Sequence, residues 1–545
     1  MNTAKDEEGS EKKSASSIKK ETGKNTMRPE LIEMIKRYAF GLDENRPEAV
    51  AKRQQKNQRT ARANVEDFCD AGSFIEYGAL AIAAQRGRRS EGDLISKTPA
   101  DGLIAGIGSV NGSAFKDDKS RCMLMAYDYT VLAGTQGFFN HKKMDRMLKL
   151  AYEQRLPLVL FAEGGGGRPG DVDAIGIMTT GLDLSTFGAF AKLSGRVPVI
   201  GVVSGPCFAG NAALLGCCDV IIATRNSNIG MGGPVMIEGG GLGVFKPEEV
   251  GPIDVQSENG VVDIEVADDT EAVAAARKYL SYFQGTTFRW EAADQLRLRD
   301  LIPENHKRAY NVRTVIKALA DTDSFLELRS KFGPGIITGF LRIEGRPFGL
   351  IANNCMHMAG AIEAEGADKA AKLMQICQAH NLPILSLCDT PGFMVGPEIE
   401  KRAQVRHVCR MFVIGSHLTV PYFTIVLRRG YGLGAMAMAR GGFHESFFTA
   451  AWPTGEFGAM GIEGAIKAGF KKELAAIEDP AEREKLYEEL VAQLYKRGNA
   501  INIASYLEID SVIDPADTRK WITQGVKSVP AGKFQETCHS FVDPW

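Results

Sequence analysis

The stretch GLIAGIGSVNGSAF at residues 102–115 returns as GIITGFLRIEGRPF at residues 335–348, with three glycines and the last phenylalanine in register. Two further blocks repeat in the same order. LPLVLFAEGGGG (156–167) matches LPILSLCDTPGF (382–393), and VPVIGVVSGPCFAGNAAL (197–214) matches VPYFTIVLRRGYGLGAMAM (420–438). An ordered series of this kind decides the fold, because it indicates that one structural unit was duplicated in tandem.

Each copy alternates short apolar runs with longer amphipathic segments. In the first copy RCMLMAYDYTVL, PLVLFAE and VPVIGVVSG are typical of strands, and residues 142–154 of a helix. In the second copy FGLIANN, PILSLCDT and PYFTIVLRR are typical of strands, and residues 366–379 of a helix. This rhythm predicts an α/β layer structure with parallel strands covered by helices. We expect a charged, helical boundary at 286–315, which divides the chain into domains at 29–290 and 291–545.

Length and composition narrow the class of protein. A chain of 545 residues is too long for one hydrophobic core, and its net charge of −2 provides no general attraction to nucleic acid or to an acidic membrane. Residues 1–28 are rich in Lys, Glu, Ser and Thr, which predicts a disordered tail and no signal peptide. No apolar run reaches the roughly 18 residues that a membrane span needs.

The ten cysteines are scattered and lack the spacing of a zinc site. We therefore expect reduced, mostly buried thiols and no metal. Reduced thiols favour the cytoplasm, or the mitochondrial matrix if the source is eukaryotic.

Glycine-rich loops follow two strands in each copy: AEGGGGR and GPCFAGN in the first, CDTPGF and GYGLGAM in the second. Ligand sites of α/β sheets lie at such strand ends, where backbone N–H groups point outward. Two loops side by side would aim a pair of N–H donors at one point, as in an oxyanion hole. Tight turns are the plainer alternative. A nucleotide loop is disfavoured, because GxxxxGK[ST] is absent and GxGxxG lacks its context.

Several long blocks carry a family resemblance. GPCFAGNAALLGCCDVIIAT resembles the crotonase signature, and TIVLRRGYGLGAMAM, FFTAAWPTGEFGAMGIEGAIK and IDSVIDPADTRKWI closely resemble the carboxyltransferase subunits of biotin-dependent acyl-CoA carboxylases. The resemblance covers residues 30–545 and is strongest in the C-terminal half. It implies two crotonase-like domains of the ββα-superhelix fold that Clp proteases share. It also implies a homo-oligomer, a hexamer built as a trimer of dimers, whose active site lies between the first domain of one chain and the second domain of another.

The same resemblance implies one oxyanion hole in each domain. The acyl-CoA thioester hole is assigned to Gly165, Gly166, Ala209 and Gly210. The hole for the biotin ureido oxygen is assigned to Gly392, Phe393, Gly434 and Ala435. Met436 and Ala437 stand where propionyl-type relatives place an Asp, which predicts an apolar acyl pocket. Backbone donors suffice for this chemistry, because an enolate oxygen needs N–H groups aimed at it in a dry site.

Other polar residues receive weaker assignments. His141 and His357 are the best-placed histidines, although a structural role is favoured for both. Asp389 is expected to hold its loop through hydrogen bonds. A cluster of basic residues could meet the phosphates of CoA, or could simply be solvated: Lys142, Lys143 and Arg146.

Two parts of a complete carboxylase are missing from this sequence. It contains neither an Ala/Val-Met-Lys-Met biotin attachment site nor an ATP-grasp-like segment. We therefore expect a biotin carboxylase and a biotin carboxyl carrier subunit or domain as partners. The leading hypothesis is transfer of CO2 from carboxybiotin to the α or γ carbon of an acyl-CoA. Two alternatives stay open: a subunit of a biotin-dependent acyl-CoA decarboxylase, and a noncatalytic scaffold of the same fold. A crotonase-like hydratase would need paired carboxylates, and only Glu163 is near.

Overall fold

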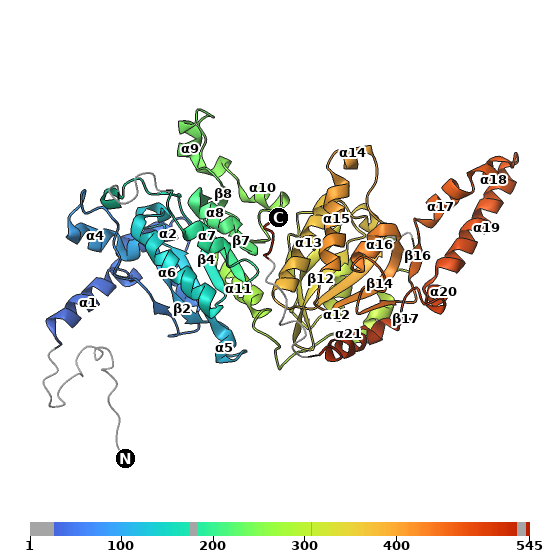
Figure 1. The fold of residues 1–545 in the computed structure, drawn as a ribbon, viewed down its shortest axis with the longest axis horizontal. Coiled ribbons are helices and arrows are strands. Elements are labelled where there is room, and N and C mark those ends of the chain that lie inside the picture. The colour runs from blue at the N-terminus through green and yellow to red at the C-terminus, as the bar shows by residue number, and fades with distance from the viewer. Residues whose placement is uncertain (1–26, 175–181, 307, 531–540) are drawn as a thin grey trace, which may run out of the picture.

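The computed structural model describes residues 27–174, 182–306, 308–530 and 541–545. Two α/β units lie side by side along the long axis, the first coloured blue to green and the second yellow to red (Figure 1). Each unit is built around one large sheet. The tail expected at 1–28 lies outside the described residues, apart from its last two positions.

The first sheet has the strand order β1-β2-β3-β4-β5-β7-β9. Its strands are β1 Ile75–Glu76, β2 Leu103–Ser109, β3 Arg121–Tyr127, β4 Leu158–Phe161, β5 Val199–Val203, β7 Val220–Thr224 and β9 Ile264–Val266. Strands from β3 onward run parallel, whereas β1, β2 and β3 pair antiparallel. The expected parallel sheet is therefore mixed, because the short connection between β2 and β3 cannot make the crossover that a parallel pair requires.

The second sheet repeats this order and direction as β10-β11-β12-β13-β14-β15-β17. Its strands are β10 Leu326–Leu328, β11 Ile336–Ile343, β12 Arg346–Asn353, β13 Ile384–Thr390, β14 Tyr422–Tyr431, β15 Phe448–Ala451 and β17 Ser511–Val512, and β16 Glu456–Gly458 pairs with β14. Glu344 and Gly345 form a two-residue turn with positive φ between β11 and β12, which sets the register of that hairpin. The duplication in the sequence is thus a duplication of topology.

Helices cover both faces of the sheets. In the first unit they are α1 Pro29–Ala39, α2 Pro47–Gln54, α3 Ala61–Phe68, α4 Glu91–Lys97, α5 Asp117–Ser120, α6 Phe138–Gln154, α7 Thr186–Ala191, α8 Gly210–Gly216, α9 Pro234–Gly239, α10 Ile253–Glu258 and α11 Asp269–Ser281. In the second unit they are α12 Val312–Leu319, α13 Ala364–Ala379, α14 Pro397–Glu400, α15 Gln404–Ser416, α16 Gly432–Met438, α17 Ile462–Gly469, α18 Lys471–Ala475, α19 Pro480–Gly498, α20 Ala500–Ser505 and α21 Thr518–Lys527. None of the helices in the described ranges has the length and apolarity needed to cross a membrane.

The largest hydrophobic core is shared by the two units, because it contains buried residues of both sheets and of α11 and α13 between them. Tyr279 of α11 and Tyr282, which caps the C-terminus of that helix, pack on Phe340 of β11 with ring centroids 5.6 and 5.4 Å apart. Each buried aromatic side chain of this size contributes about 1.5–3 kcal/mol to folding. Separate cores fill the outer faces of the two sheets.

The segment at 286–315 differs from the expected helix. Apart from residue 307, which is not described, its helical parts are the 3-10 helix Gln295–Asp300 and the first residues of α12. Its charged residues favour helix locally, but a short helix without a continuous apolar face to bury is marginal in water.

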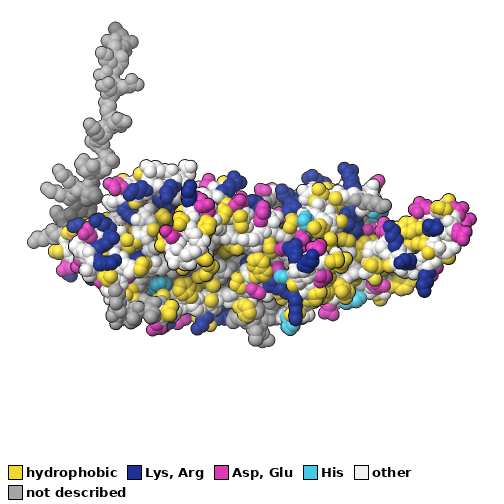
Figure 2. Space-filling view, turned by 90° about the horizontal axis from the view of Figure 1, so that it is seen from above, with side chains coloured by type: hydrophobic (Ala, Val, Ile, Leu, Met, Phe, Trp, Pro, Cys, Tyr) yellow, Lys and Arg dark blue, Asp and Glu magenta, His cyan; other side chains and the backbone are white. Residues whose placement is uncertain are grey.

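A helical arm, α17 to α19, projects from the second unit at the red end of the chain (Figure 1) and forms the narrow tip of the elongated molecule in Figure 2. Only Gly498 of α19 is buried, so the arm is largely exposed in the single chain.

Candidate active site

The glycine loop after β4 leaves one backbone donor free. The N–H of Gly165 donates to the carbonyl of Ala133 at 3.2 Å, and that of Gly166 to Oδ1 of Asn211 at 3.0 Å. Gln136 pairs with the residues on either side of Gly167. Its N–H donates to the carbonyl of Gly166, and its carbonyl accepts from the N–H of Arg168. Within the described residues, the N–H of Gly167 therefore has no protein partner.

The loop after β13 repeats this pattern. The N–H of Gly392 donates to Oγ1 of Thr390 at 3.1 Å. Ile362 pairs with the residues on either side of Phe393: its N–H donates to the carbonyl of Gly392, and its carbonyl accepts from the N–H of Met394. Gly392 has φ of +122° and Gly166 has +86°, values that favour glycine. The N–H of Phe393 is the counterpart of the Gly167 N–H and, among the described residues, is likewise unpaired.

A second loop meets each glycine loop. A Cβ atom added at Gly434 would lie 2.6 Å from the carbonyl carbon of Gly392 and 2.9 Å from the nitrogen of Phe393. In the first unit, a Cβ atom at Gly166 would lie 2.6 Å from Cβ of Ala209 and 3.5 Å from the nitrogen of Gly210. The predicted pairs of loops therefore converge in both units.

These hydrogen bonds correct which backbone groups are available. Gly165, Gly166 and Gly392 were expected to donate to a ligand, but their N–H groups are used within the protein. Gly210 is the first residue of α8 and Gly434 the third of α16, positions whose N–H has no partner inside the helix. Ala435 follows one position later, where the N–H joins the helix ladder. Among the described residues, the donors available where the loops converge therefore include Gly167 with Gly210, and Phe393 with Gly434.

A third element around each pair of loops was missed from the sequence. Residues 132–134 (Leu-Ala-Gly) and 358–360 (Met-Ala-Gly) each have three consecutive positive φ values. A Cβ at Gly134 would collide with the carbonyl oxygen of Glu163, and one at Gly360 with that of Asp389. Such backbone is costly for residues other than glycine and persists where the surroundings enforce it. The signal that could have found it is the repeated Ala-Gly between the first two blocks of each copy.

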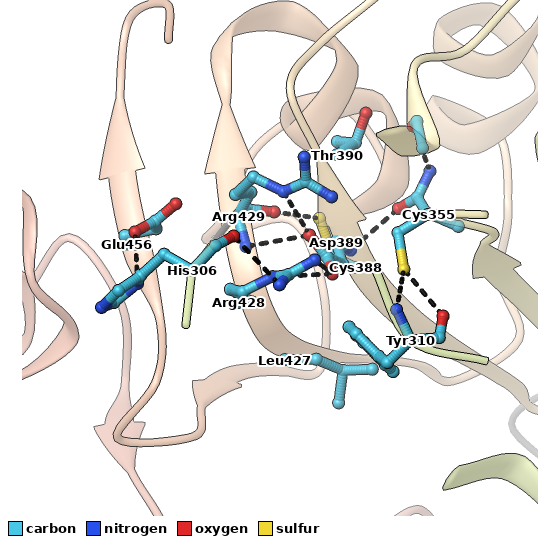
Figure 3. Close-up of polar contacts among 12 residues, drawn as sticks. His306, Tyr310, Cys355, Cys388, Asp389, Thr390, Leu427, Arg428, Arg429 and Glu456 are labelled. Carbon is cyan, nitrogen blue, oxygen red and sulfur yellow. Dashed lines mark hydrogen bonds and ion pairs between the residues drawn. The ribbon is translucent and has the colours of Figure 1, made fainter. Parts of the chain in front are cut away.

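Buried ion pairs hold the strand end that precedes each glycine loop. Glu163 accepts from Arg53 at 2.7 Å, and burial raises the pKa of Glu163 to about 7 although Arg53 opposes this shift. In the second unit Asp389 lies between Arg428 and Arg429, at 3.1 and 2.7 Å (Figure 3).

Asp389 has the loop-holding role expected of it. Its N–H donates to Oδ1 of Asn353 at 3.0 Å, while Arg428 also donates to the carbonyls of His306 and Arg308. This network ties the segment between the two units to the end of β13 (Figure 3).

The remaining polar candidates are held in structural contacts. His141 Nδ1 lies 3.0 Å from Oγ1 of Thr186, and burial lowers its pKa, while His357 Nε2 lies 3.0 Å from Glu363. Lys143 is buried, which disfavours both alternatives given for it, a solvated side chain and a contact with CoA phosphates. Its buried Nζ donates to the carbonyls of Ala100 and Leu103, and burial lowers its pKa to about 8. Lys142 and Arg146 are exposed on α6, with the Lys142 ammonium 4.7 Å from the ring centre of Phe138.

Of the two positions predicted to line an acyl pocket, Met436 borders a cavity and Ala437 does not. A cavity of about 830 Å³ opens beside the second hole and is lined mainly by apolar side chains, among them Leu433, Met436, Phe457 and Ile462. Ala437 is fully buried in the shared core and does not line this cavity.

Comparisons with known proteins agree with this geometry. The family model described as carboxyl transferase domain matches residues 52–536. A single-chain, multi-domain long-chain acyl-CoA carboxylase of known structure is 56% identical, with a TM-score of 0.87 over 92% of this chain and 49% of that one. This chain therefore spans about half the length of that carboxylase.

Two further relatives resemble nearly the whole chain. The crystal structure of a transcarboxylase 12S hexamer, with methylmalonyl-CoA bound, is 28% identical with a TM-score of 0.78, over 95% of this chain and 99% of that one. The biotin-dependent long chain acyl-coenzyme A carboxylase beta4 subunit of Mycobacterium tuberculosis is 29% identical over 91% of this chain and 93% of its own length.

The chain belongs to the carboxyl transferase family, whose fold here is a pair of crotonase-like α/β units. Its class is that of the biotin-dependent acyl-CoA carboxyltransferases.

Proposed function

We propose that this carboxyltransferase binds an acyl-CoA thioester at the first pair of loops and biotin at the second, and carboxylates the acyl-CoA. The observation that carries the proposal is the occurrence of two matched pairs of converging loops, one in each repeat, each with unpaired N–H groups. The boundary between the two halves falls near residue 290, between the last strand of the first sheet and the first strand of the second.

In the first repeat the N–H groups of Gly167 and Gly210 donate to the thioester oxygen. Gly165, Gly166 and Ala209 shape the loop that presents them. The negative charge of an enolate concentrates on this oxygen, so donors held in advance stabilise the transition state more than the ground state. Asn211 keeps Gly166 in place from the side of α8.

In the second repeat the N–H groups of Phe393 and Gly434 donate to the ureido oxygen, with Gly392 and Ala435 as their neighbours. Biotin supplies the carboxyl group when it is carried, carboxylated, on a partner domain, and its ureido group can take the proton from the acyl-CoA. The site fits this group, because the N–H groups of Phe393 and Gly434 are neutral donors of the kind that a ureido oxygen accepts from. Asp389 and the two arginines keep the loop rigid.

The site is completed by a second copy of the chain in a hexamer. Around the second hole, Val395, Leu433 and Met358 are 75%, 61% and 48% exposed, which is costly for apolar side chains unless a partner covers them. The hexameric transcarboxylase supports this arrangement. The partners are a biotin carboxylase and a biotin carboxyl carrier, as subunits or as further domains. Sedimentation analysis of the purified chain tests the assembly, and a monomer at micromolar concentration would contradict it.

The acyl group is long and apolar. The cavity beside Met436 supports this, and so does the identity to the long-chain acyl-CoA carboxylase. Met436→Trp should fill part of the cavity and lower the kcat/KM for a C16 acyl-CoA at least tenfold, while a C3 acyl-CoA changes less than twofold. Met436→Leu is the matched control of similar volume. Equal losses on both substrates in the tryptophan variant would contradict an acyl pocket here.

The test of the function is carboxyl transfer from carboxybiotin to acyl-CoAs of C3 to C16, measured with the purified oligomer. We expect biotin-dependent formation of the carboxylated product, with the highest kcat/KM for long chains. A folded oligomer that transfers to none of them would refute the enzyme and leave the scaffold. Co-purification of the chain with membrane subunits in place of an ATP-dependent biotin carboxylase would favour the decarboxylase.

A further inference from the structure

A buried acid lies beside the strand that leads into the second hole. β16 pairs in parallel with the last three residues of β14, which places Glu456 opposite Arg429. Tyr431 ends β14 and is the N-cap of α16, whose third residue is Gly434. A Cβ atom added at Gly392 would lie 3.6 Å from the carbonyl oxygen of Tyr431, so Tyr431 lies against the glycine loop as well. The position of Tyr431 therefore affects the spacing of the two loops.

Glu456 and Tyr431 are buried together, with exposed fractions of 5% and 3%. Burial and the negative charge of Glu456 both raise the pKa of Tyr431. Burial also raises the pKa of Glu456, while His306 and the Tyr431 hydroxyl oppose this shift. The Nδ1 atom of His306 lies 3.2 Å from Oε2 of Glu456, as Figure 3 shows. Further charged or titratable groups face the pair from the elements packed on it: Arg428 and Arg429 of β14, Glu463 of α17 and Tyr495 of α19.

The first repeat builds the same junction without an acid or a phenol. Its strands there are β6 Pro206–Phe208 and β8 Asn228–Gly230, which pair in parallel before α8 begins. Phe208 corresponds to Tyr431, because each ends its strand and lies opposite a glycine of the partner strand. Asn228 corresponds to Glu456, because each is the first residue of that partner strand. The fold can thus make this junction with a phenyl ring and an amide, and the acid and the phenol are a feature of the second repeat.

We propose that Glu456 is a positioning residue for the second hole. Through Tyr431 it holds the end of β14, and with it the N–H groups of Phe393 and Gly434, at the spacing that a ureido oxygen requires. The inference rests on the proposed function, which assigns biotin to this hole. A buried phenol needs a polar partner, and an ionised carboxylate accepts a stronger hydrogen bond from it than a neutral carboxyl does. The hold is therefore strongest when Glu456 is ionised.

The hold matters because backbone donors act only within about 0.5 Å of their productive positions. Phe393 and Gly434 lie on different loops, so their spacing depends on what keeps the two loops together. Tyr431 meets both loops, because it directly precedes α16 and its carbonyl faces Gly392. A change at Glu456 should therefore weaken biotin binding and leave the hole of the first repeat unaffected.

The test uses two variants of the pair and one control in the full-length oligomer. Glu456→Gln keeps the size of the side chain and removes its charge. Tyr431→Phe removes only the hydroxyl and introduces the residue that the first repeat has, so it should fold. Glu463→Gln is the matched control, because it makes the same change of charge in a neighbouring acid that bonds Tyr495 of the arm at 3.2 Å. Calorimetry measures binding of biotin methyl ester, which has no titrating carboxyl group, from pH 5 to 8, and Tm is measured on the same samples.

At pH 8 both variants should bind biotin methyl ester at least tenfold more weakly than wild type, and the control should change less than twofold. The double variant should lose no more than either single variant, because the two side chains act as one unit. In the wild type the affinity should fall as the pH is lowered from 8 to 5, since protonation of Glu456 weakens the hold. In Glu456→Gln the affinity should stay level. The infrared shift of a bound, labelled thioester carbonyl should equal that of wild type in every variant.

Binding within twofold of wild type in Glu456→Gln or in Tyr431→Phe would overturn the proposal. So would a wild-type pH profile in Glu456→Gln, or an equal loss in Glu463→Gln. Should Glu456→Gln fail to fold, Tyr431→Phe decides alone.

Failure of the positioning role and failure of the proposed function give different results, because biotin binding requires no carboxyl transfer. If the variants lose biotin binding and the wild type transfers no carboxyl group, the positioning role stands and the function fails. If transfer proceeds with the same kcat/KM for biotin in wild type and variants, the function stands and the positioning role is refuted. If the wild type binds no biotin, both are refuted.

Discussion

Replacing Gly434 by alanine is the smallest change that should disable the second hole. The added Cβ atom would lie 2.6 Å from the carbonyl carbon of Gly392, about 0.8 Å inside ordinary van der Waals contact. All three of its nearest neighbours are backbone atoms of Gly392 and Phe393, so no side chain can rotate away and the loop itself must move. A displacement of this size moves the Phe393 N–H off its target.

The substitution should lower kcat strongly and reduce the free energy of unfolding only moderately. Losing one oxyanion donor lowers kcat by about 100- to 1,000-fold. Overpacking of this kind costs about 1–3 kcal/mol of folding free energy, so the variant should remain folded. The assay is steady-state carboxyl transfer between free biotin and acyl-CoA, with thermal unfolding measured on the same samples.

Gly464→Ala is the control for this prediction, because no atom lies within 4 Å of the added Cβ and the residue is in the exposed helix α17. It should retain wild-type activity. The reasoning is refuted if Gly434→Ala keeps more than about a third of the wild-type kcat, or if its loss is explained by an unfolded protein.

Two further changes address the buried acids. Asp389→Asn removes the carboxylate that Arg428 and Arg429 share. It should destabilise the protein by about 3–5 kcal/mol, because it leaves buried guanidinium groups without a counter-ion. An unchanged Tm would contradict this prediction. Burial raises the pKa of Glu163 from 4.5 to about 7. Between these pH values the folded protein keeps the carboxyl proton that the unfolded chain releases. The free energy of unfolding should therefore fall as pH rises from 4.5 to 7. In Glu163→Gln that fall, up to about 3 kcal/mol, should disappear from denaturant unfolding curves; an identical pH profile would refute the assignment.

The repeated blocks were enough to predict the duplicated topology and the two pairs of converging glycine loops. They worked because the strands are buried and apolar, and because glycine is required where two backbones approach closely. Gly166 and Gly434 illustrate this, since each faces another loop across a distance too short for a side chain. Gly392 favours glycine for another reason, its φ of +122°.

The identity of the free donors could not be predicted in the same way. Whether an N–H is available depends on partners far away in sequence, such as the side chain of Asn211 and the carbonyl of Ala133. The same reason explains Lys143, whose helix looks solvated in the sequence but packs against residues 100–103. The 286–315 segment is the opposite case. Its local charge pattern suggested a continuous helix, whereas its described residues contain a 3-10 helix and the start of α12.

The division of labour between the two repeats is the central claim, and one pair of variants tests it directly. Gly166→Ala would press on Ala209 in the first repeat, and Gly434→Ala on Gly392 in the second. The measurement is the infrared shift of a ¹³C-labelled thioester carbonyl on binding, together with calorimetric biotin binding to the same protein. We predict that Gly434→Ala keeps the carbonyl shift and loses biotin binding, and that Gly166→Ala loses the shift and keeps biotin binding. The reverse pattern, or equal loss of both signals in both variants, would contradict the assignment of one hole to each repeat.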